Sequence, residues 1–90
     1  MTLLDIEQAI QKAVPGCQVW VMDPNHDGEH LQAIVVSPSF ENIPLIKQHQ
    51  MVMRPLTKAF DESLHALALK TFTPDKWQDG KEEYSSFIQD

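Results

Sequence analysis

The chain has 90 residues, of which 42% are hydrophobic, and a formal net charge of −6 at pH 7. This length allows one domain with a single core, and no apolar run approaches the roughly 20 residues that a membrane-spanning helix needs. The acidic balance argues against strong non-specific binding to nucleic acid. A single cysteine, Cys17, excludes an internal disulfide and any zinc or iron–sulfur site built only from cysteines of this chain. The first residues contain no basic-then-apolar leader, so we expect a cytoplasmic protein.

The first third of the chain predicts one helix and two strands. Thr2 is a candidate cap for a helix that Pro15-Gly16 ends, and its apolar stripe consists of Leu3, Ile6, Ile10 and Ala13. Two segments rich in β-forming residues, 17–22 and 30–36, predict strands. The polar segment 23–29 contains Asp-Pro and Asp-Gly steps, which predict the loop of a hairpin.

The second half predicts helical structure followed by a third strand. Residues 43–60 are expected to be helical, with a buried stripe of Leu45, Val52, Leu56 and Phe60. Pro55 either kinks this helix or lies in the first turn of a second one. Residues 64–72 predict a strand, residues 73–75 a turn, and residues 78–90 a short helix or a frayed tail.

This order of elements defines the expected fold class. It predicts a two-layer α+β domain with the order α-β-β-α-α-β, in which helices pack on one face of a three-stranded sheet. We assign residues 1–78 to the domain and residues 79–90 to an acidic C-terminal tail. Phe72 and Trp77 are expected in the core, and Cys17 is expected to be a small buried hydrophobe.

Several segments together resemble the BolA family. They are Gln32 to Ser37, Phe40, a helix containing His49, and above all Leu64-His65-Ala66-Leu67 followed by Thr73-Pro74-Asp75-Lys76-Trp77. The similarity extends from about Val19 to Trp77, with the segments in the family's order and spacing. It implies a fold similar to type II KH domains.

The resemblance also implies a binding role rather than catalysis. Proteins of this kind pair with monothiol glutaredoxins and share a [2Fe-2S] cluster, for which the glutaredoxin and glutathione supply thiolates. The strand histidine of the family is matched by His65. A second ligand comes from the loop between the first two strands, where this chain has His30 and His26 and no cysteine, so it resembles the histidine-loop branch. Both residues remain candidates for that ligand, and no cofactor is expected on the isolated chain.

A second hypothesis is a transcriptional regulator that binds nucleic acid through the KH-like or helix-turn-helix face. Lys47, Arg54 and Lys58 lie in a stretch without acids, but the family's basic-His-basic triplet reads Gln48-His49-Gln50 here, so we expect weak DNA binding at most. We expect no enzyme, because the chain lacks a nucleophile with a positioned base and a phosphate-binding glycine loop. Whether the chain associates with itself is left open by the sequence.

Overall fold

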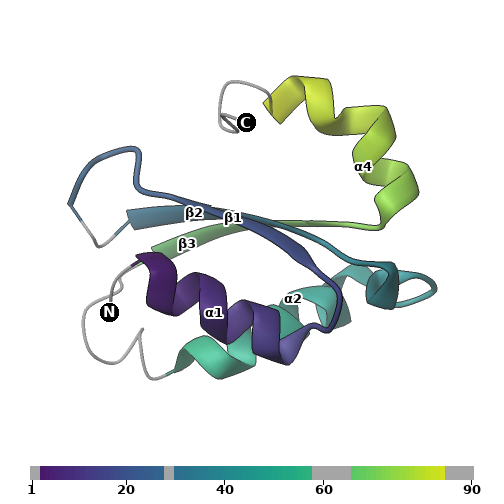
Figure 1. Cartoon of the computed structure of the whole chain (residues 1–90), viewed down its shortest axis with the longest axis horizontal. Coiled ribbons are helices and arrows are strands. Elements are labelled where there is room, and N and C mark those ends of the chain that lie inside the picture. The colour runs from purple at the N-terminus through teal and green to yellow at the C-terminus, as the bar shows by residue number, and fades with distance from the viewer. Residues whose placement is uncertain (1–2, 28–29, 58–65, 85–90) are drawn as a thin grey trace.

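A computed structural model describes residues 3–27, 30–57 and 66–84 of the chain. Its three strands are β1 (Gln18–Met22), β2 (His30–Val36) and β3 (Ala66–Phe72), and they form one sheet in the order β1-β2-β3. β1 pairs with β2 antiparallel, whereas β3 pairs with β2 parallel. The expected α+β domain with a three-stranded sheet is therefore confirmed (Figure 1). The predicted start of the third strand at Leu64 lies outside the described residues, as does the Thr2 cap.

Helix α1 (Leu3–Ala13) lies on one face of the sheet (Figure 1). Ile6 and Ile10, two residues of the predicted stripe, are buried there. The chain then turns at Gly16, whose positive φ of 71° is a conformation that glycine adopts without strain. The core on this face joins α1 to β1, β2 and the second helix, and its buried members are Ile6, Ile10, Val14, Val19, Leu31, Val35, Phe40, Val52 and Leu56.

The second helical region divides at Pro55. A short 3₁₀ helix, η1 (Pro38–Phe40), precedes α2 (Leu45–Met53), and a second one, η2 (Arg54–Leu56), follows it. Pro55 lies in the first turn of η2, where its missing N–H costs no helical hydrogen bond, so the second of the two alternatives is confirmed. The predicted stripe is half right, because Val52 and Leu56 are fully buried but Leu45 is 61% exposed. Leu45 is the first residue of α2, in which Gln48 and Val52 are the buried residues. Phe60 is outside the described residues.

The C-terminal segment differs from the prediction. Residues 73–75 do not form an isolated turn: the Thr73 hydroxyl accepts from the Lys76 N–H and caps α4 (Pro74–Gly80), which has Pro74 in its first turn. α4 and the 3₁₀ helix η3 (Lys81–Tyr84) lie on the sheet face opposite α1 and α2 (Figure 1). α1 and α2 share one face as expected, but the expectation that all helices would do so is wrong for α4.

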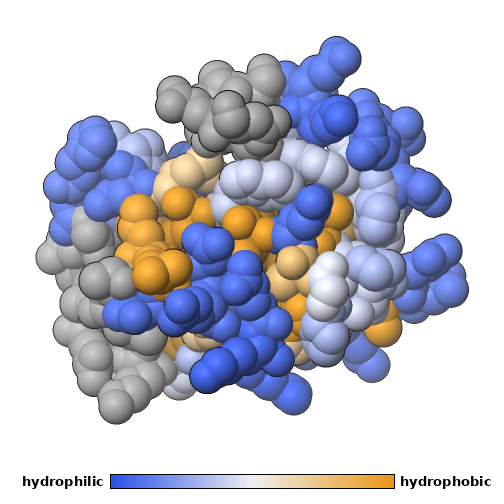
Figure 2. All heavy atoms as spheres, viewed as in Figure 1, coloured by the Kyte–Doolittle hydropathy of each residue, from blue (hydrophilic) through white to orange (hydrophobic). Residues whose placement is uncertain are grey.

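A second, smaller core holds α4 on this face. Trp77 is 6% exposed and its ring stacks on that of Trp20, with centroids 5.1 Å apart. Phe72 and Tyr84 complete the aromatic cluster, their centroids 5.6 Å apart. The core position of Trp77 is confirmed, whereas Phe72 is partly buried and packs against this core; Tyr84, inside the predicted tail 79–90, packs against the same core. In the view of Figure 2, hydrophobic side chains lie over the strands, between the more hydrophilic helical segments.

A buried hydrogen-bond network fixes α2 against β3. The Thr71 hydroxyl donates to Gln48 Oε1 at 2.7 Å, and Gln48 Nε2 donates to the carbonyls of Ile43 at 2.7 Å and Phe40 at 3.2 Å. Gln48 is 8% exposed and Thr71 is 9% exposed, so these polar groups depend on one another for partners. Throughout the three described ranges, no helix combines the length and apolar character that crossing a bilayer requires.

Candidate functional site

The candidate site lies where β2 and β3 begin. Because these two strands are parallel, both start at the same end of the sheet, and the register makes His30 the partner of Ala66. The sequence places His65 directly before Ala66; His65 itself lies outside the described residues. The fold therefore places His30, one predicted ligand, beside Ala66. Ala66 directly follows His65, the other predicted ligand, in the sequence.

His30 is held by Asp27 at two points. Asp27 Oδ1 accepts from the His30 backbone N–H at 3.0 Å, and Asp27 Oδ2 lies 3.0 Å from His30 Nδ1. The His30 side chain is 51% exposed. A carboxylate on one ring nitrogen favours the tautomer that carries its proton there, which directs the lone pair of the other nitrogen outward. This arrangement is typical of histidines that bind metals.

His26 is placed differently. It lies in the loop between β1 and β2 with a positive φ of 54°, and its backbone N–H donates to the carbonyl of Asp23 at 3.1 Å. Asp23 also accepts from the Asp27 N–H through its side chain, at 3.2 Å. His26 is exposed at this turn, whereas His30 begins a strand. Asp27 thus organises the loop around His30.

Cys17 lies at the other end of the sheet. β1 pairs Gln18 with Val36, the last residue of β2, so Cys17 is separated from His30 by the seven residues of β2, about 20 Å at the usual rise of a strand. Cys17 is half-buried and packs against the main core, close to its predicted role. Burial raises the pKa of its thiol, which disfavours the thiolate that binds metals.

Metal-ligating side chains do not cluster in the described part of the chain. Within residues 3–27, 30–57 and 66–84, no three His, Cys, Asp or Glu side chains are grouped so that they could hold a metal ion. The sheet carries a largely apolar pocket, which His30 does not line; its lining residues are Met22, Gln32, Ala33, Ile34, Ala68, Lys70 and Tyr84. These side chains are suited to packing rather than to proton transfer or coordination.

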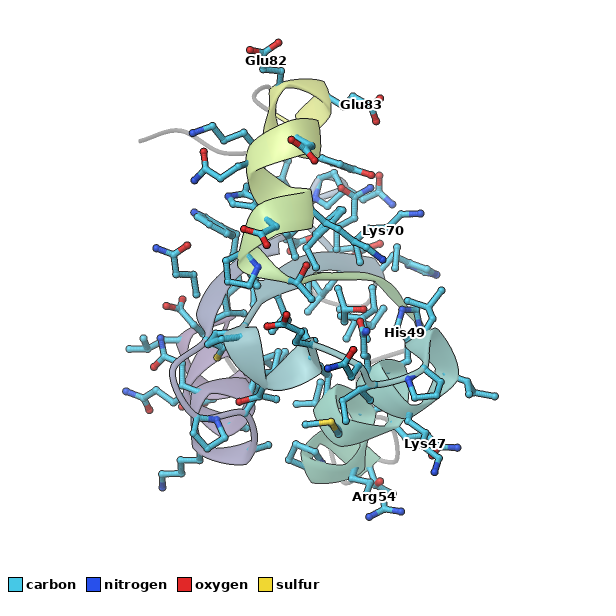
Figure 3. All side chains as sticks on the ribbon, turned by 90° about the vertical axis from the view of Figure 1, so that its right-hand side faces the viewer. Lys47, His49, Arg54, Lys70, Glu82 and Glu83 are labelled. Carbon is cyan, nitrogen blue, oxygen red and sulfur yellow. The ribbon has the colours of Figure 1, made fainter. Side chains whose placement is uncertain are left out.

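The predicted cationic residues lie on a separate surface. Lys47 and Arg54 are exposed and line a shallow groove on α2 with Ile43, Gln50 and Met51. Figure 3 shows Lys70 of β3 and His49, Lys47 and Arg54 of the α2–η2 region along one side of the molecule, with Glu82 and Glu83 at the far end. His49 is half-buried on α2, so it lies in a helix as the sequence predicts. Lys58 is outside the described residues.

Sequence reasoning missed two residues that organise these surfaces. The sequence indicates Asp27 only as a turn residue, but its spacing of three from His30 allows its carboxylate to accept the N–H at the strand start. The sequence indicates Gln48 only as the loss of a cation from the family's triplet, but Gln48 is buried and bridges α2 to β3. A polar residue at a core-facing helical position, four before Val52, was the available signal for Gln48.

Comparisons with known proteins define the family. Residues 4–76 match the family model described as BolA-like protein. The chain is 32% identical over 80 residues to the DNA-binding transcriptional regulator BolA of Haemophilus influenzae, covering 81% of this chain and 78% of that protein. The structure is similar to that of a BolA protein homologue from Coxiella burnetii, with 33% identity, a TM-score of 0.71 and coverage of 87% and 97% of the two chains. It is also similar to the BolA domain of SufE1 from Arabidopsis thaliana, with 25% identity, a TM-score of 0.71 and coverage of 82% and 93%. The chain belongs to the BolA family.

Proposed function

We propose that this protein is a cytoplasmic adaptor that pairs with a monothiol glutaredoxin and contributes imidazole ligands from His65 and His30 to a shared [2Fe-2S] cluster. In this role it serves iron–sulfur delivery or iron homeostasis and carries out no catalytic step of its own. The observation that carries the proposal is the parallel register that pairs His30 with Ala66, the residue after His65.

The chemistry of the donor set supports this assignment. His30 has a carboxylate on Nδ1, which orients the ring so that its other nitrogen can serve as a ligand. Two histidines in place of two cysteines on one iron raise the reduction potential of a [2Fe-2S] cluster and add ligands that can be protonated.

The number of thiols in this chain supports the need for a partner protein in cluster binding. A [2Fe-2S] cluster with two histidine ligands still needs two thiolates. The single cysteine of this chain lies at the opposite end of β2 and its thiol pKa is raised by burial, so both thiolates are assigned to the glutaredoxin and its glutathione. Assignment of the chain to the histidine-loop branch remains a prediction.

The experiment is a reconstitution with iron, sulfide and glutathione on a monothiol glutaredoxin, with and without this protein. We expect a one-to-one complex and a visible circular dichroism spectrum that differs from that of the glutaredoxin alone. Both should be lost in His65→Ala and kept in His49→Ala, a matched histidine change on α2. An unchanged spectrum on adding the wild-type chain, or equal loss in both variants, would overturn the proposal.

A second function is favoured by one surface. Lys47 and Arg54 are exposed along the α2 groove, and a relative at 32% identity is named as a DNA-binding transcriptional regulator. Weak contact between α2 and phosphate groups, assisted by Lys58, would make the chain a regulator. Fluorescence anisotropy with duplex DNA should then show affinity that falls steeply with salt and falls further in Lys47→Ala, and binding unaffected by either change would exclude this surface.

A further inference from the structure

β3 is an edge strand of the sheet. It pairs with β2 on one side, and within the described residues no further strand lies on its other side. The Ser37 N–H donates to the Phe72 carbonyl at 3.0 Å, which continues the parallel ladder past the end of β2. Both backbone groups of a strand residue point to the same side, and the side alternates along the strand. Phe72 and every second residue before it therefore face β2. The residues whose N–H and C=O groups point outward are Leu67, Leu69 and Thr71.

A pocket lies on the sheet beside this edge. Its lining includes Ala68 and Lys70 of β3, and its volume of about 110 Å³ has room for an aliphatic side chain. Lys70 is the register partner of Ile34, which packs in the aromatic core on the α4 face, so Lys70 and Ala68 both point to that face. Ala68 is exposed and has only a methyl group. A longer side chain on a strand beside β3 therefore reaches across Ala68 into the pocket.

The charge beside this edge is positive. Lys70 is exposed, and no ion pair within the described residues uses it. Figure 3 shows Lys70 on the same side of the molecule as Lys47 and Arg54. The whole chain has a net charge of −6, so it repels an acidic partner in general, whereas this side attracts one. The other edge strand, β1, contains no charged residue.

We propose that the outer edge of β3 binds an extended segment of a partner protein as a fourth strand. In this complex an apolar side chain of the partner enters the pocket over Ala68, and an acidic side chain lies opposite Lys70. The two side chains are two positions apart in the partner, because residues i and i+2 of a strand share a face. Main-chain hydrogen bonds supply the affinity and the pocket supplies the selectivity, as in other complexes formed by strand addition. The proposal does not rest on cluster binding, since it needs only the isolated chain.

Other occupants match the edge less well. Phosphate groups of a nucleic acid accept hydrogen bonds but do not donate them to the outward carbonyls of β3, and they leave the apolar pocket unfilled. A second copy paired through the same strand offers no acid to Lys70, because β3 contains none. A lysine on an edge strand normally discourages strand pairing. An acidic residue in the partner removes this obstacle and makes the pairing selective.

The first measurement is an NMR titration of the isotope-labelled chain with the peptide acetyl-Thr-Glu-Thr-Leu-Thr-Glu-Thr-amide. Its leucine has a glutamate two positions away on either side, so the probe fits β3 in either direction. We expect saturable shifts in the amides of β3, with a dissociation constant below ~1 mM. We also expect slower hydrogen exchange at Leu69 and Thr71, whose N–H groups are then bonded. The absence of saturable binding, or shifts confined to β1, would overturn the proposal.

Methylation of backbone nitrogens in the peptide tests the strand addition itself. One variant is methylated at the leucine and both glutamates, and the other at three of the threonines. N–H groups alternate between the two sides of a strand, so only one of these sets donates to β3. We expect one variant to lose at least about tenfold in affinity and the other to bind as the unmodified peptide does. Loss in the threonine variant indicates an antiparallel strand and loss in the other a parallel one; equal effects in both would contradict strand addition.

Charge exchange tests the contact with Lys70. Lys70→Glu should weaken binding at least about tenfold, and a peptide with lysines in place of the glutamates should restore it. Lys12→Glu, which changes an exposed lysine on α1, is the matched control and should bind as the wild type does. Equal weakening in both variants would refute a specific contact, with circular dichroism confirming that each is folded. If a DNA duplex shifts the β3 amides and the peptide does not, the edge contacts nucleic acid and the proposal is wrong.

Discussion

Asp27 holds both the backbone and the ring of His30: its two carboxylate oxygens lie 3.0 Å from the His30 backbone nitrogen and from Nδ1. One residue therefore fixes the start of β2 and the orientation of a proposed metal ligand. The loop that carries His26 and His30 is organised by this contact rather than by its turn residues alone.

The first prediction concerns that carboxylate. Asp27→Ala removes the partner of His30 Nδ1, and we expect cluster retention in the glutaredoxin complex to fall by roughly 10–100-fold, as for other groups that orient ligating histidines. The measurement is the rate at which the visible circular dichroism disappears when a chelator is added. Asp75→Ala, which removes an exposed acid from α4, is the control. Equal rates in the two variants would contradict a role for Asp27.

The second prediction separates the two loop histidines. His30 starts a strand and is held by Asp27, whereas His26 lies at an exposed turn. We therefore expect His30→Ala to lose the spectrum of the shared cluster and His26→Ala to keep it. Spectra recorded on the same glutaredoxin preparation decide the matter, and the reverse result would assign the second ligand to His26.

The third prediction concerns the bridge between α2 and β3. Thr71→Val keeps the shape of the side chain but leaves Gln48 Oε1 buried without the hydroxyl that donates to it. We expect the free energy of unfolding to fall by about 1–3 kcal/mol, and Tm by about 4–8 °C for each kcal/mol. Thr57→Val is the control, since the Thr57 hydroxyl is exposed and donates to the carbonyl of Arg54 within its own helical turn. If urea denaturation shows the same loss of unfolding free energy in both variants, the buried Thr71–Gln48 hydrogen bond adds no stability.

The fourth prediction concerns the segment expected to be a tail. Tyr84 contacts Phe72 and Trp77, with ring centroids 5.6 Å and 6.1 Å apart. Because Tyr84 is half-buried, we expect Tyr84→Ala to lower the free energy of unfolding by about 1–3 kcal/mol, less than for a fully buried aromatic residue. Glu83→Ala should change it by less than about 0.5 kcal/mol. If both variants have the same midpoint of denaturant unfolding as the wild type, the residues after 78 add no stability. They would then behave as the predicted tail.

The fifth prediction is a pH dependence. Burial raises the pKa of the Cys17 thiol above its ordinary value of 9.0, so the unfolded chain loses this proton first as pH rises. The stabilising contribution is complete below the ordinary pKa and is lost as pH rises through the raised pKa of the folded state. Wild-type stability should therefore fall more steeply above pH 9 than that of Cys17→Ala. The measurement is the free energy of unfolding of both proteins, from urea denaturation between pH 7 and pH 10. Parallel curves of this free energy against pH for the wild type and Cys17→Ala would contradict this account.

Local sequence was sufficient for the elements whose periodicity is strong. The spacing of Ile6 and Ile10 predicted the buried side of α1, and the segments rich in β-forming residues before and after the hairpin loop predicted β1 and β2. The strand and the Thr-Pro-x-x-Trp segment near the end of the chain indicated the family, which the match over residues 4–76 confirms. These features depend on neighbours in the chain, which a sequence displays directly.

Local sequence failed where side chains from distant segments compete for one surface. A helical stripe predicted Leu45 in the core, but Leu45 is 61% exposed, whereas Gln48 of the same helical turn is buried and accepts a hydrogen bond from Thr71 of β3. Thr73-Pro74-Asp75 has the composition of a turn and also of a capped helix start. The segment forms a helix start rather than an isolated turn, because α4 packs the ring of Trp77 against those of Trp20 and Phe72.

The sequence by itself determined the inventory: one domain, one cysteine, a histidine at the start of each of two strands, and too few cysteines to hold a cluster without a partner. Only the tertiary structure decided which groups meet. The parallel register sets His30 beside Ala66, the length of β2 separates Cys17 from them, and the reach of a carboxylate across three residues joins Asp27 to His30. Pairing of strands and packing of helices are non-local, and they set these distances in a way that residue spacing along the chain does not express.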